Sequence, residues 1–256
     1  MAEKGWRMTA DIANVRSIQS GATVRAIEPA QRTAAKVAGL FYLLMLVTAT
    51  FAELYVPRRL IVSGDAVETA KRIAASEGLF RLGIVGDVIT FAGDVVLIWA
   101  LYIVLRPVNR NAALLAAFWR LAECAILAIA TLSHSAALLF LSGDGYLRPI
   151  DTQQLQVLMY TFLRMYAAGY RVGLVFFGLG STVFAYVWFQ SRYIPRALAA
   201  WGIFASLGVV IFGLGGMVFP GLTTSAMLAF FLPIFLFELT LGVWLLVKGI
   251  RAPVAG

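Results

Sequence analysis

The fold is decided by two neighbouring stretches, LFRLGIVGDVITFAGDVVLIWALYIVL at residues 79–105 and AALLAAFWRLAECAILAIATLSHSAALLFL at residues 112–141. Only the short basic sequence RPVNRN connects them. A transmembrane helix needs about 20 consecutive, mostly apolar residues. Because both stretches are longer than that, they predict a hairpin of two transmembrane helices that tilt or protrude beyond the bilayer.

Apolar runs of this kind cover most of the chain. Of its 256 residues, 61% are hydrophobic and only 13% are charged, which is too few to build the polar surface of a soluble domain. The sequence therefore predicts an all-α, polytopic integral membrane protein, with a bundle of six transmembrane helices in a domain at residues 34–256. The expected spans lie at about residues 37–56, 79–105, 112–141, 172–189, 198–219 and 226–247.

The segments outside the spans are polar or amphipathic. Residues 1–33 are polar and basic, and we expect a flexible cytoplasmic tail rather than a signal peptide, because the first apolar run begins far from the start. In the outer connections, Asp65–Glu77 and Asp151–Tyr166 carry amphipathic helical patterns. Each is expected to form a helix that lies along the membrane surface or caps the bundle.

The basic charge of the chain indicates its orientation. The net charge is +8, and the side that carries the N-terminal tail has 12 of the Lys and Arg residues, against 8 on the other side. Lys and Arg accumulate in cytoplasmic loops, so we expect both termini in the cytoplasm. Basic loops beside a membrane also explain the net charge without a nucleic-acid partner.

Several motifs point to a known family. They are KVAGLFYLLMLVTATFAE (36–53), SEGLFRLGIVGDVI (76–89), LRPVNRNAALLAAFWRLAE (105–123), GLVFFGLG (173–180), YIPRALA (193–199) and LFELTLGVWLLVKGIR (236–251). Through these stretches the chain resembles the bacterial membrane-protein family called domain of unknown function 4386 (DUF4386). The resemblance implies six spans in the bacterial cytoplasmic (inner) membrane. Because that family has no established activity, the resemblance implies no catalytic residues.

The counts of cysteine and histidine exclude several kinds of site. Cys124 and His134 are the single cysteine and the single histidine of the chain. One cysteine cannot build a thiolate zinc site, an iron–sulfur cluster or an internal disulfide, and one histidine cannot supply both axial ligands of a bis-histidine haem. We therefore expect no cofactor, no metal site and no catalytic residue.

Ionisable side chains inside the spans are expected to face the bundle interior and to find partners, because a charge facing lipid is costly. Counting from the basic turns, at a rise of about 1.5 Å per residue, places them at two depths. A mid-depth layer contains Asp94, Arg120, Glu123 and Glu238, and an outer layer contains Glu53, Arg81, Asp87, His134 and Arg171. The spacing of Arg120 and Glu123 also allows them to pair within one helix.

The mid-depth layer combines three acids with one arginine. Three bare carboxylates are costly at that depth, so some of them should be protonated or should bind a cation. This charge excess favours a site that responds to protons or cations. A buried ion pair that only fixes the register of the helices explains Arg120 more simply, and both interpretations stay open.

Three classes of function follow from these features. The first is a small transporter or binding protein for an ion or small molecule, acting as a homo-oligomer because six spans are few. The second is a non-catalytic component that binds lipid or a partner protein through the tail and the surface helices. A membrane-embedded enzyme comes last, because the chain has no HExxH pair and no recognisable serine–histidine arrangement.

Overall fold

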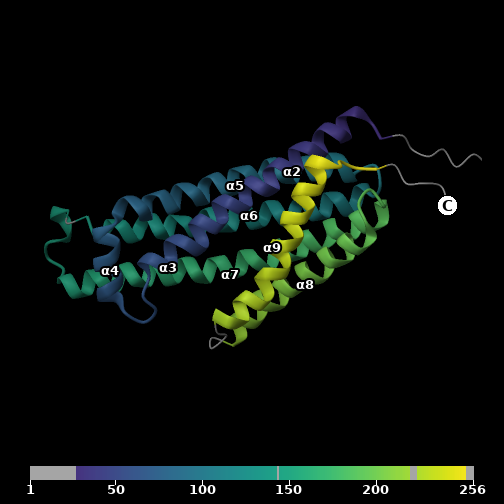
Figure 1. Cartoon of the computed structure of the whole chain (residues 1–256). Helices are drawn as coiled ribbons and strands as arrows, with labels where there is room; N and C mark the ends of the chain where they lie inside the picture. The colour runs from purple at the N-terminus through teal and green to yellow at the C-terminus, as the bar shows by residue number, and fades with distance from the viewer. Residues whose placement is uncertain (1–26, 143, 220–223, 252–256) are drawn as a thin grey trace, which may run out of the picture.

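The protein is a helical bundle (Figure 1). The computed structural model describes residues 27–142, 144–219 and 224–251. Within these ranges six helices are long and apolar enough to cross a membrane, and no strand occurs. The predicted all-α bundle of six transmembrane helices is confirmed, and the protein is a multi-pass membrane protein. The expected tail at residues 1–33 lies mostly outside the described residues.

The helices follow one another along the chain with short connections. They are α2 Pro29–Ala49, the π-helix η1 Thr50–Tyr55, α3 Val56–Leu60, α4 Ala66–Ala75, α5 Glu77–Leu105, α6 Arg110–Leu139, the short 3₁₀-helix η2 Gly145–Leu147, α7 Thr152–Ser191, α8 Arg196–Val218 and α9 Thr224–Val247. The helices α2, η1 and α3 run on as one helix of 32 residues.

The first helix begins earlier than the sequence predicts. Pro29 occupies its first turn, where a missing N–H costs nothing. Glu28 and Gln31 form a capping box, in which the Glu28 backbone N–H donates to Gln31 Oε1 at 3.1 Å. This start signal lies within the stretch that we expected to be a polar tail.

Of the two amphipathic connections, one forms a separate helix as expected and the other does not. Ala66–Ala75 forms the expected short helix, α4, and buries Ile73. Asp151–Tyr166 does not form a separate surface helix: after Asp151 it is the first part of α7, which has 40 residues and is about 60 Å long. Met159, Leu163 and Tyr166 are buried and continue the packed face of the span, so nothing separates the two segments.

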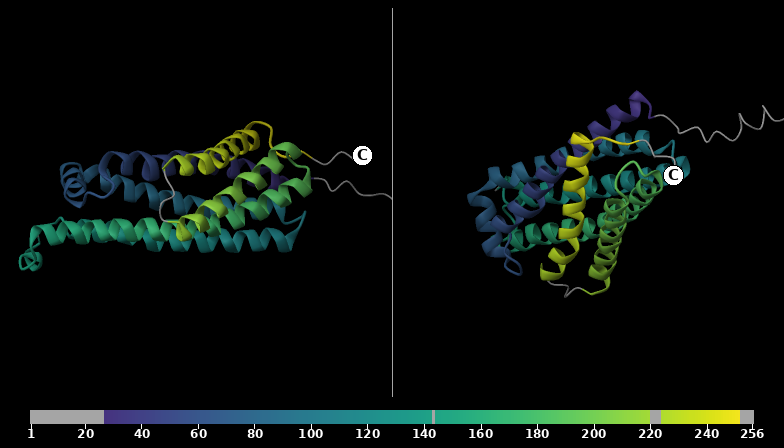
Figure 2. Two further views of the ribbon diagram at one scale, coloured as in Figure 1. Left: turned by 90° about the horizontal axis from the view of Figure 1, so that it is seen from below. Right: turned by 45° about the vertical axis from the view of Figure 1, so that its right-hand side comes forward.

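The six long helices form an elongated bundle (Figures 1 and 2), and their pairwise packing closes it into a ring. Going around the ring, α2 packs on α5, α5 on α6, α6 on α7, α7 on α8, α8 on α9 and α9 back on α2. The first part of α7 extends beyond α8 and α9, which Figure 1 shows at the left. Both ends of the described chain lie at the opposite end of the ring, where the basic turns also lie.

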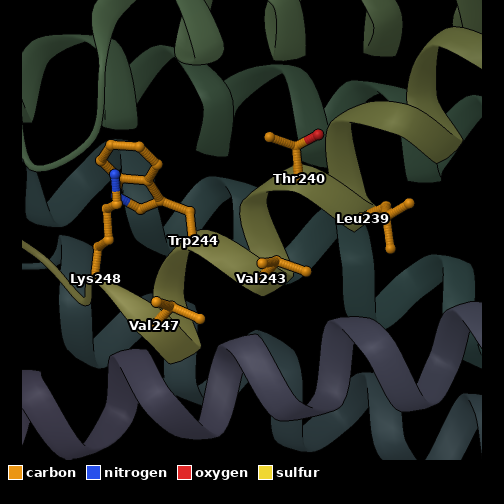
Figure 3. Close-up of a pocket in the computed structure, with 6 residues that line it drawn as sticks. All are labelled: Leu239, Thr240, Val243, Trp244, Val247 and Lys248. Atoms are coloured by element: carbon orange, nitrogen blue, oxygen red, sulfur yellow. The ribbon is translucent and has the colours of Figure 1, made fainter.

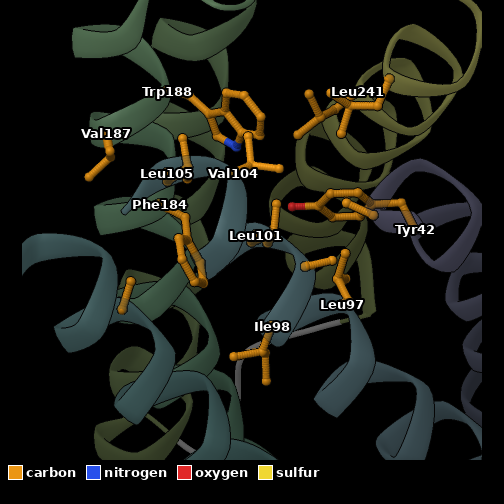
Figure 4. Packing of buried hydrophobic residues seen from close by; sticks show 14 of the residues in the cluster. Tyr42, Leu97, Ile98, Leu101, Val104, Leu105, Phe184, Val187, Trp188 and Leu241 are labelled. Atoms are coloured by element: carbon orange, nitrogen blue, oxygen red, sulfur yellow. The ribbon is translucent and has the colours of Figure 1, made fainter. Parts of the chain in front are cut away.

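An apolar plug closes the ring near these basic turns (Figure 4). The plug consists of Leu101, Val104, Leu105, Phe184, Trp188 and Leu241, all of which are buried. It combines side chains from α5, α7 and α9, which are not neighbours in the ring, so it packs across the interior. A second apolar cluster surrounds α4 at the other end and includes Ile73, Phe80 and Met159.

Glycines allow the helices of the ring to approach closely. A Cβ atom on Gly39 of α2 would lie 2.8 Å from the carbonyl oxygen of Gly242 on α9. A Cβ atom on Gly178 of α7 would lie 2.8 Å from the carbonyl oxygen of Ser206 on α8. Small residues at such contacts are the usual basis of helix association in membranes.

Gly178→Ala is therefore expected to destabilise the protein relative to Gly208→Ala. Both changes add the same helix propensity, but a Cβ on Gly208 would meet only Phe230 at 3.4 Å, whereas a Cβ on Gly178 must move the α8 backbone. We expect a difference of about 1–3 kcal/mol in the free energy of unfolding, measured by denaturant titration in detergent. Equal stabilities would mean that α7 and α8 do not pack this closely.

Candidate functional site

A buried arginine connects α5 and α6 inside the ring. Arg120 Nη2 donates to Asp94 Oδ1 at 2.8 Å, and Arg120 Nη1 lies 3.1 Å from Glu123 Oε2. Arg120 and Glu123 are each only 3% exposed, and Asp94 is 7% exposed. The pairing of Arg120 with Glu123 that the spacing allows is therefore present, and Asp94 of the same predicted layer pairs with Arg120 as well. Because the three groups are buried together, their attraction is not screened by water.

The α7 helix is shaped to fit the arginine. A Cβ atom on Gly180 would lie 2.7 Å from Arg120 Cγ, so the aliphatic part of the side chain rests against this glycine. The guanidinium carbon lies 4.3 Å from the centre of the Phe177 ring. Such a cation–π contact adds stabilisation when the cation is desolvated. The ion pairs and the packing on α7 together fix the position of the guanidinium.

Glu238 is the fourth member of the mid-depth layer, on α9. It interacts electrostatically with Arg120 and Asp94, but within the described residues it makes no hydrogen bond or ion pair. Its side chain is half-buried. The ring therefore gathers all four residues at one depth, with Asp94 and Glu123 in direct contact with Arg120 and Glu238 beside them.

Cys124 adds a sulfur atom to this layer. The ligand atoms of Asp94, Glu123 and Cys124 lie within 4.8 Å of one another, a spacing that a metal ion could bridge. The Arg120 guanidinium already contacts both carboxylates, and a metal ion would have to displace it. We therefore assign no metal to these residues.

A second polar group, the outer cluster, consists of Glu53, Asp87, His134 and Tyr166. His134 Nδ1 lies 3.8 Å from Asp87 Oδ2, and the Tyr166 hydroxyl donates to the Glu53 carboxylate. The His134 ring stacks on the Tyr166 ring at 3.6 Å between centroids. Glu53 lies in the π-helix η1, a distortion that is frequent at functional sites.

Arg81 and Arg171, expected in the outer layer, do not join the outer cluster. Arg81 is exposed and pairs with Glu77 on its own helix at 2.6 Å. Arg171 is half-buried and packs its stem against α8, where a Cβ atom on Gly216 would lie 3.1 Å from Arg171 Cδ. Around α5, Arg81 is rotated by more than 90° from Asp87, and around α7, Arg171 is rotated by more than 90° from Tyr166. Depth along the helix therefore does not tell which side chains contact the outer cluster.

Hydroxyl groups lie between the two depths, at positions that the sequence did not identify as part of a site. Tyr170 interacts electrostatically with Glu53 and Asp87 on one side and with Glu123 and Asp94 on the other. The Thr90 hydroxyl donates to the Thr48 hydroxyl at 2.7 Å, on the α5 stripe between Asp87 and Asp94. The only sequence signal for this group was the repeat of polar side chains at helical spacing, as in Tyr166 and Tyr170.

These features define a class: a multi-pass membrane protein whose six-helix ring encloses two levels of buried polar side chains. The chain matches the family described as domain of unknown function (DUF4386) over residues 37–249, and it belongs to that family. This confirms the resemblance found in the sequence. Searches of curated proteins and of solved structures give no match.

Arg120→Ala is expected to lower the free energy of unfolding by about 3–5 kcal/mol, because it leaves two buried acids without a cation. Arg81→Ala is the matched control: it also removes an arginine from an ion pair, but at an exposed position, and should cost no more than about 1 kcal/mol. Denaturant unfolding in detergent measures both. Addition of Asp94→Asn to Arg120→Ala should restore part of the loss, and equal losses for the two arginine variants would contradict the pairing.

Proposed function

We propose that the protein is a small membrane transporter, or a binding protein, whose mid-depth layer takes up a proton or a small cation. The observation that carries this proposal is the charge excess. In the described part of the ring, Arg120 is the one cation that interacts with Asp94, Glu123 and Glu238. An uncompensated carboxylate inside a membrane is costly, so the layer is more stable when it holds an additional positive charge.

The three acids have different roles in this proposal. Asp94 and Glu123 hold Arg120 directly. Glu238 is half-buried and has no hydrogen-bond partner among the described residues, so it can gain and lose a proton or a cation without breaking an existing contact. Glu238 is therefore the proposed exchange site, and Asp94, Arg120 and Glu123 set the charge around it.

The route to the layer is proposed to come from the outer cluster. Polar side chains continue from Glu53 and His134 through Tyr166 and then Tyr170, whose rings lie 6.0 Å apart, toward Glu123. In the other direction, the residues of the apolar plug (Figure 4) lie along α5, α7 and α9 between the layer and the ends of these helices at the basic turns. Release of the proton or cation toward the basic turns would require the plug to open. Alternating access uses helix movements of this kind.

A purely structural ion pair is the second candidate, and one observation favours it. Gly180 and Phe177 fit Arg120 closely, as expected for a side chain that never moves. In that case the protein would be a non-catalytic membrane component that binds lipid or a partner protein. Transport measurements separate the two candidates, because a structural pair carries no ion across the membrane.

The proposed location is the bacterial cytoplasmic membrane, with both termini in the cytoplasm. The match to DUF4386 supports this location, because the resemblance found in the sequence implies a family of bacterial inner-membrane proteins. The orientation is supported by the excess of Lys and Arg on the side of the tail, and by the position of both described chain ends at the same end of the ring. We include a homo-oligomer in the proposal because six helices are few for a transporter.

Glu238→Gln is expected to abolish ion flux. Purified protein in liposomes that contain a pH-sensitive dye should dissipate an imposed proton or potassium gradient faster than empty liposomes do. The amide of the variant carries no negative charge and no exchangeable acidic proton, so its rate should fall to that of empty liposomes. Asp94→Asn and Glu123→Gln should reduce the rate as well.

Glu77→Gln is the control for these variants, since Glu77 is an exposed acid outside the ring interior. Its flux should equal that of the wild type. If wild type and Glu238→Gln both behave like empty liposomes under proton, sodium and potassium gradients, the transport proposal is wrong and the structural pair stands.

The orientation predicts which engineered cysteines a membrane-impermeant maleimide can reach in intact cells. Ser63→Cys, at the end of the ring near α4, should be labelled directly, and Gln190→Cys, near the basic turns, only after permeabilisation. Both positions are exposed and uncharged, so the changes leave the charge bias intact. The native Cys124 is buried and should give little background. Labelling of Gln190→Cys in intact cells would reverse the proposed orientation.

A further inference from the structure

A shallow groove runs along the outer face of α9 (Figure 3). Its volume is about 330 Å³, and it is lined by Leu239, Thr240, Val243, Trp244, Val247 and Lys248. These residues form two parallel rows at helical spacing, which Figure 3 shows as Leu239, Val243 and Val247 on one side and Thr240, Trp244 and Lys248 on the other. The groove thus begins among apolar side chains within the span and ends at a charged one.

The apolar part of the groove faces outward from the ring. Val243 and Val247 are exposed, whereas Leu241 and Leu245 of the same helix are fully buried in the core. The helix has α2 on one side and α8 on the other, so its remaining face is the one that meets the bilayer. At this depth the surrounding molecules are lipid chains.

Two cations are held together at the end of the groove. Lys248 Nζ lies 4.8 Å and the Arg251 guanidinium carbon 5.6 Å from the centre of the Trp244 ring. Tryptophan is typical of the depth at which lipid head groups meet the hydrocarbon chains. Within the described residues, neither cation forms an ion pair with a carboxylate.

The surroundings of this pair are also basic. The Arg251 backbone N–H donates to the Tyr193 carbonyl oxygen at 3.1 Å, which places the end of the described chain against the turn that carries Arg192 and Arg196. From Thr152 to the end of the chain the sequence contains a single acid, Glu238, which lies deep in the ring. Positive charges so close together repel one another, and an anion between them would relieve that repulsion.

We infer that this groove binds an anionic phospholipid of the surrounding bilayer, with its phosphate at Lys248 and Arg251 and an acyl chain along Val243 and Val247. The positive charge of Lys248 and Arg251 selects an anionic head group over a zwitterionic one. The apolar row of Leu239, Val243 and Val247 gives the acyl chain a continuous contact. This site is separate from the mid-depth layer, and it does not depend on whether the protein transports an ion.

The test compares two phospholipids that differ only in their head group. Purified full-length protein is delipidated in detergent, then titrated with phosphatidylglycerol or phosphatidylcholine of identical chains, and native mass spectrometry counts the bound lipids. The wild type should retain phosphatidylglycerol more tightly. Lys248→Gln with Arg251→Gln should weaken the binding of phosphatidylglycerol roughly thirtyfold, about 2 kcal/mol, since the variant lacks two cations that attract anionic lipid.

The control is Arg58→Gln with Arg59→Gln at the opposite end of the ring. It also removes two exposed charges and one cation–π contact, since Arg59 lies 5.5 Å from the Tyr55 ring. This variant should bind phosphatidylglycerol as the wild type does. An equal loss in both double variants, or equal binding of the two lipids by the wild type, would overturn the site.

A further variant tests the groove itself. Val243→Trp fills the groove but leaves both cations in place, and Val243 faces outward, so the change does not overpack the core. This variant should also bind phosphatidylglycerol more weakly than the wild type does. If binding is unchanged in this variant, Lys248 and Arg251 alone hold the lipid, and the proposed binding of an acyl chain in the groove is refuted.

Discussion

The contact of Arg120 with Asp94 and Glu123 is the constraint on which the ring depends. A charge buried without a partner in a membrane protein is costly, so α5 and α6 must keep the register that holds Asp94 2.8 Å from Arg120. Glu123, on the same helix as Arg120, lies 3.1 Å from the guanidinium. The α7 helix must present Gly180 at the same depth, because a side chain there would meet the arginine stem. One guanidinium thereby fixes the relative position of three helices.

The two levels of polar side chains differ in their balance of charge. The mid-depth layer contains an arginine, whereas the outer cluster has Glu53 and Asp87 with only His134 as a possible cation among the described residues. On the other side of the mid-depth layer, the apolar plug separates it from the basic turns. At the other end, Phe80 of the apolar cluster around α4 packs against His134 of the outer cluster, so the polar interior of the ring lies between two apolar clusters.

Much of this structure follows from the sequence. The apolar runs predict the six helices, and the helical spacing within the 112–141 run predicts that Arg120 and Glu123 can pair. Depth counting from the Pro107 turn also brought Asp94 to the correct level. The same counting placed Arg81 and Arg171 at the depth of the outer layer, but neither contacts the outer cluster, because depth along a helix says nothing of the direction in which a side chain points.

The sequence by itself determined the membrane class, the number of membrane-spanning helices, the basic turns at one end of the bundle and the family, because all of these depend on composition and local pattern. The closure of the ring through α9 and α2, and the choice of Gly180 and Phe177 as neighbours of Arg120, were decided only by the tertiary structure. The same holds for α7, which the sequence divided into a surface helix and a span and which packing keeps as one helix of 40 residues. The physical reason is that contacts between helices depend on their rotation and crossing, and these are settled by the whole set of packed side chains together.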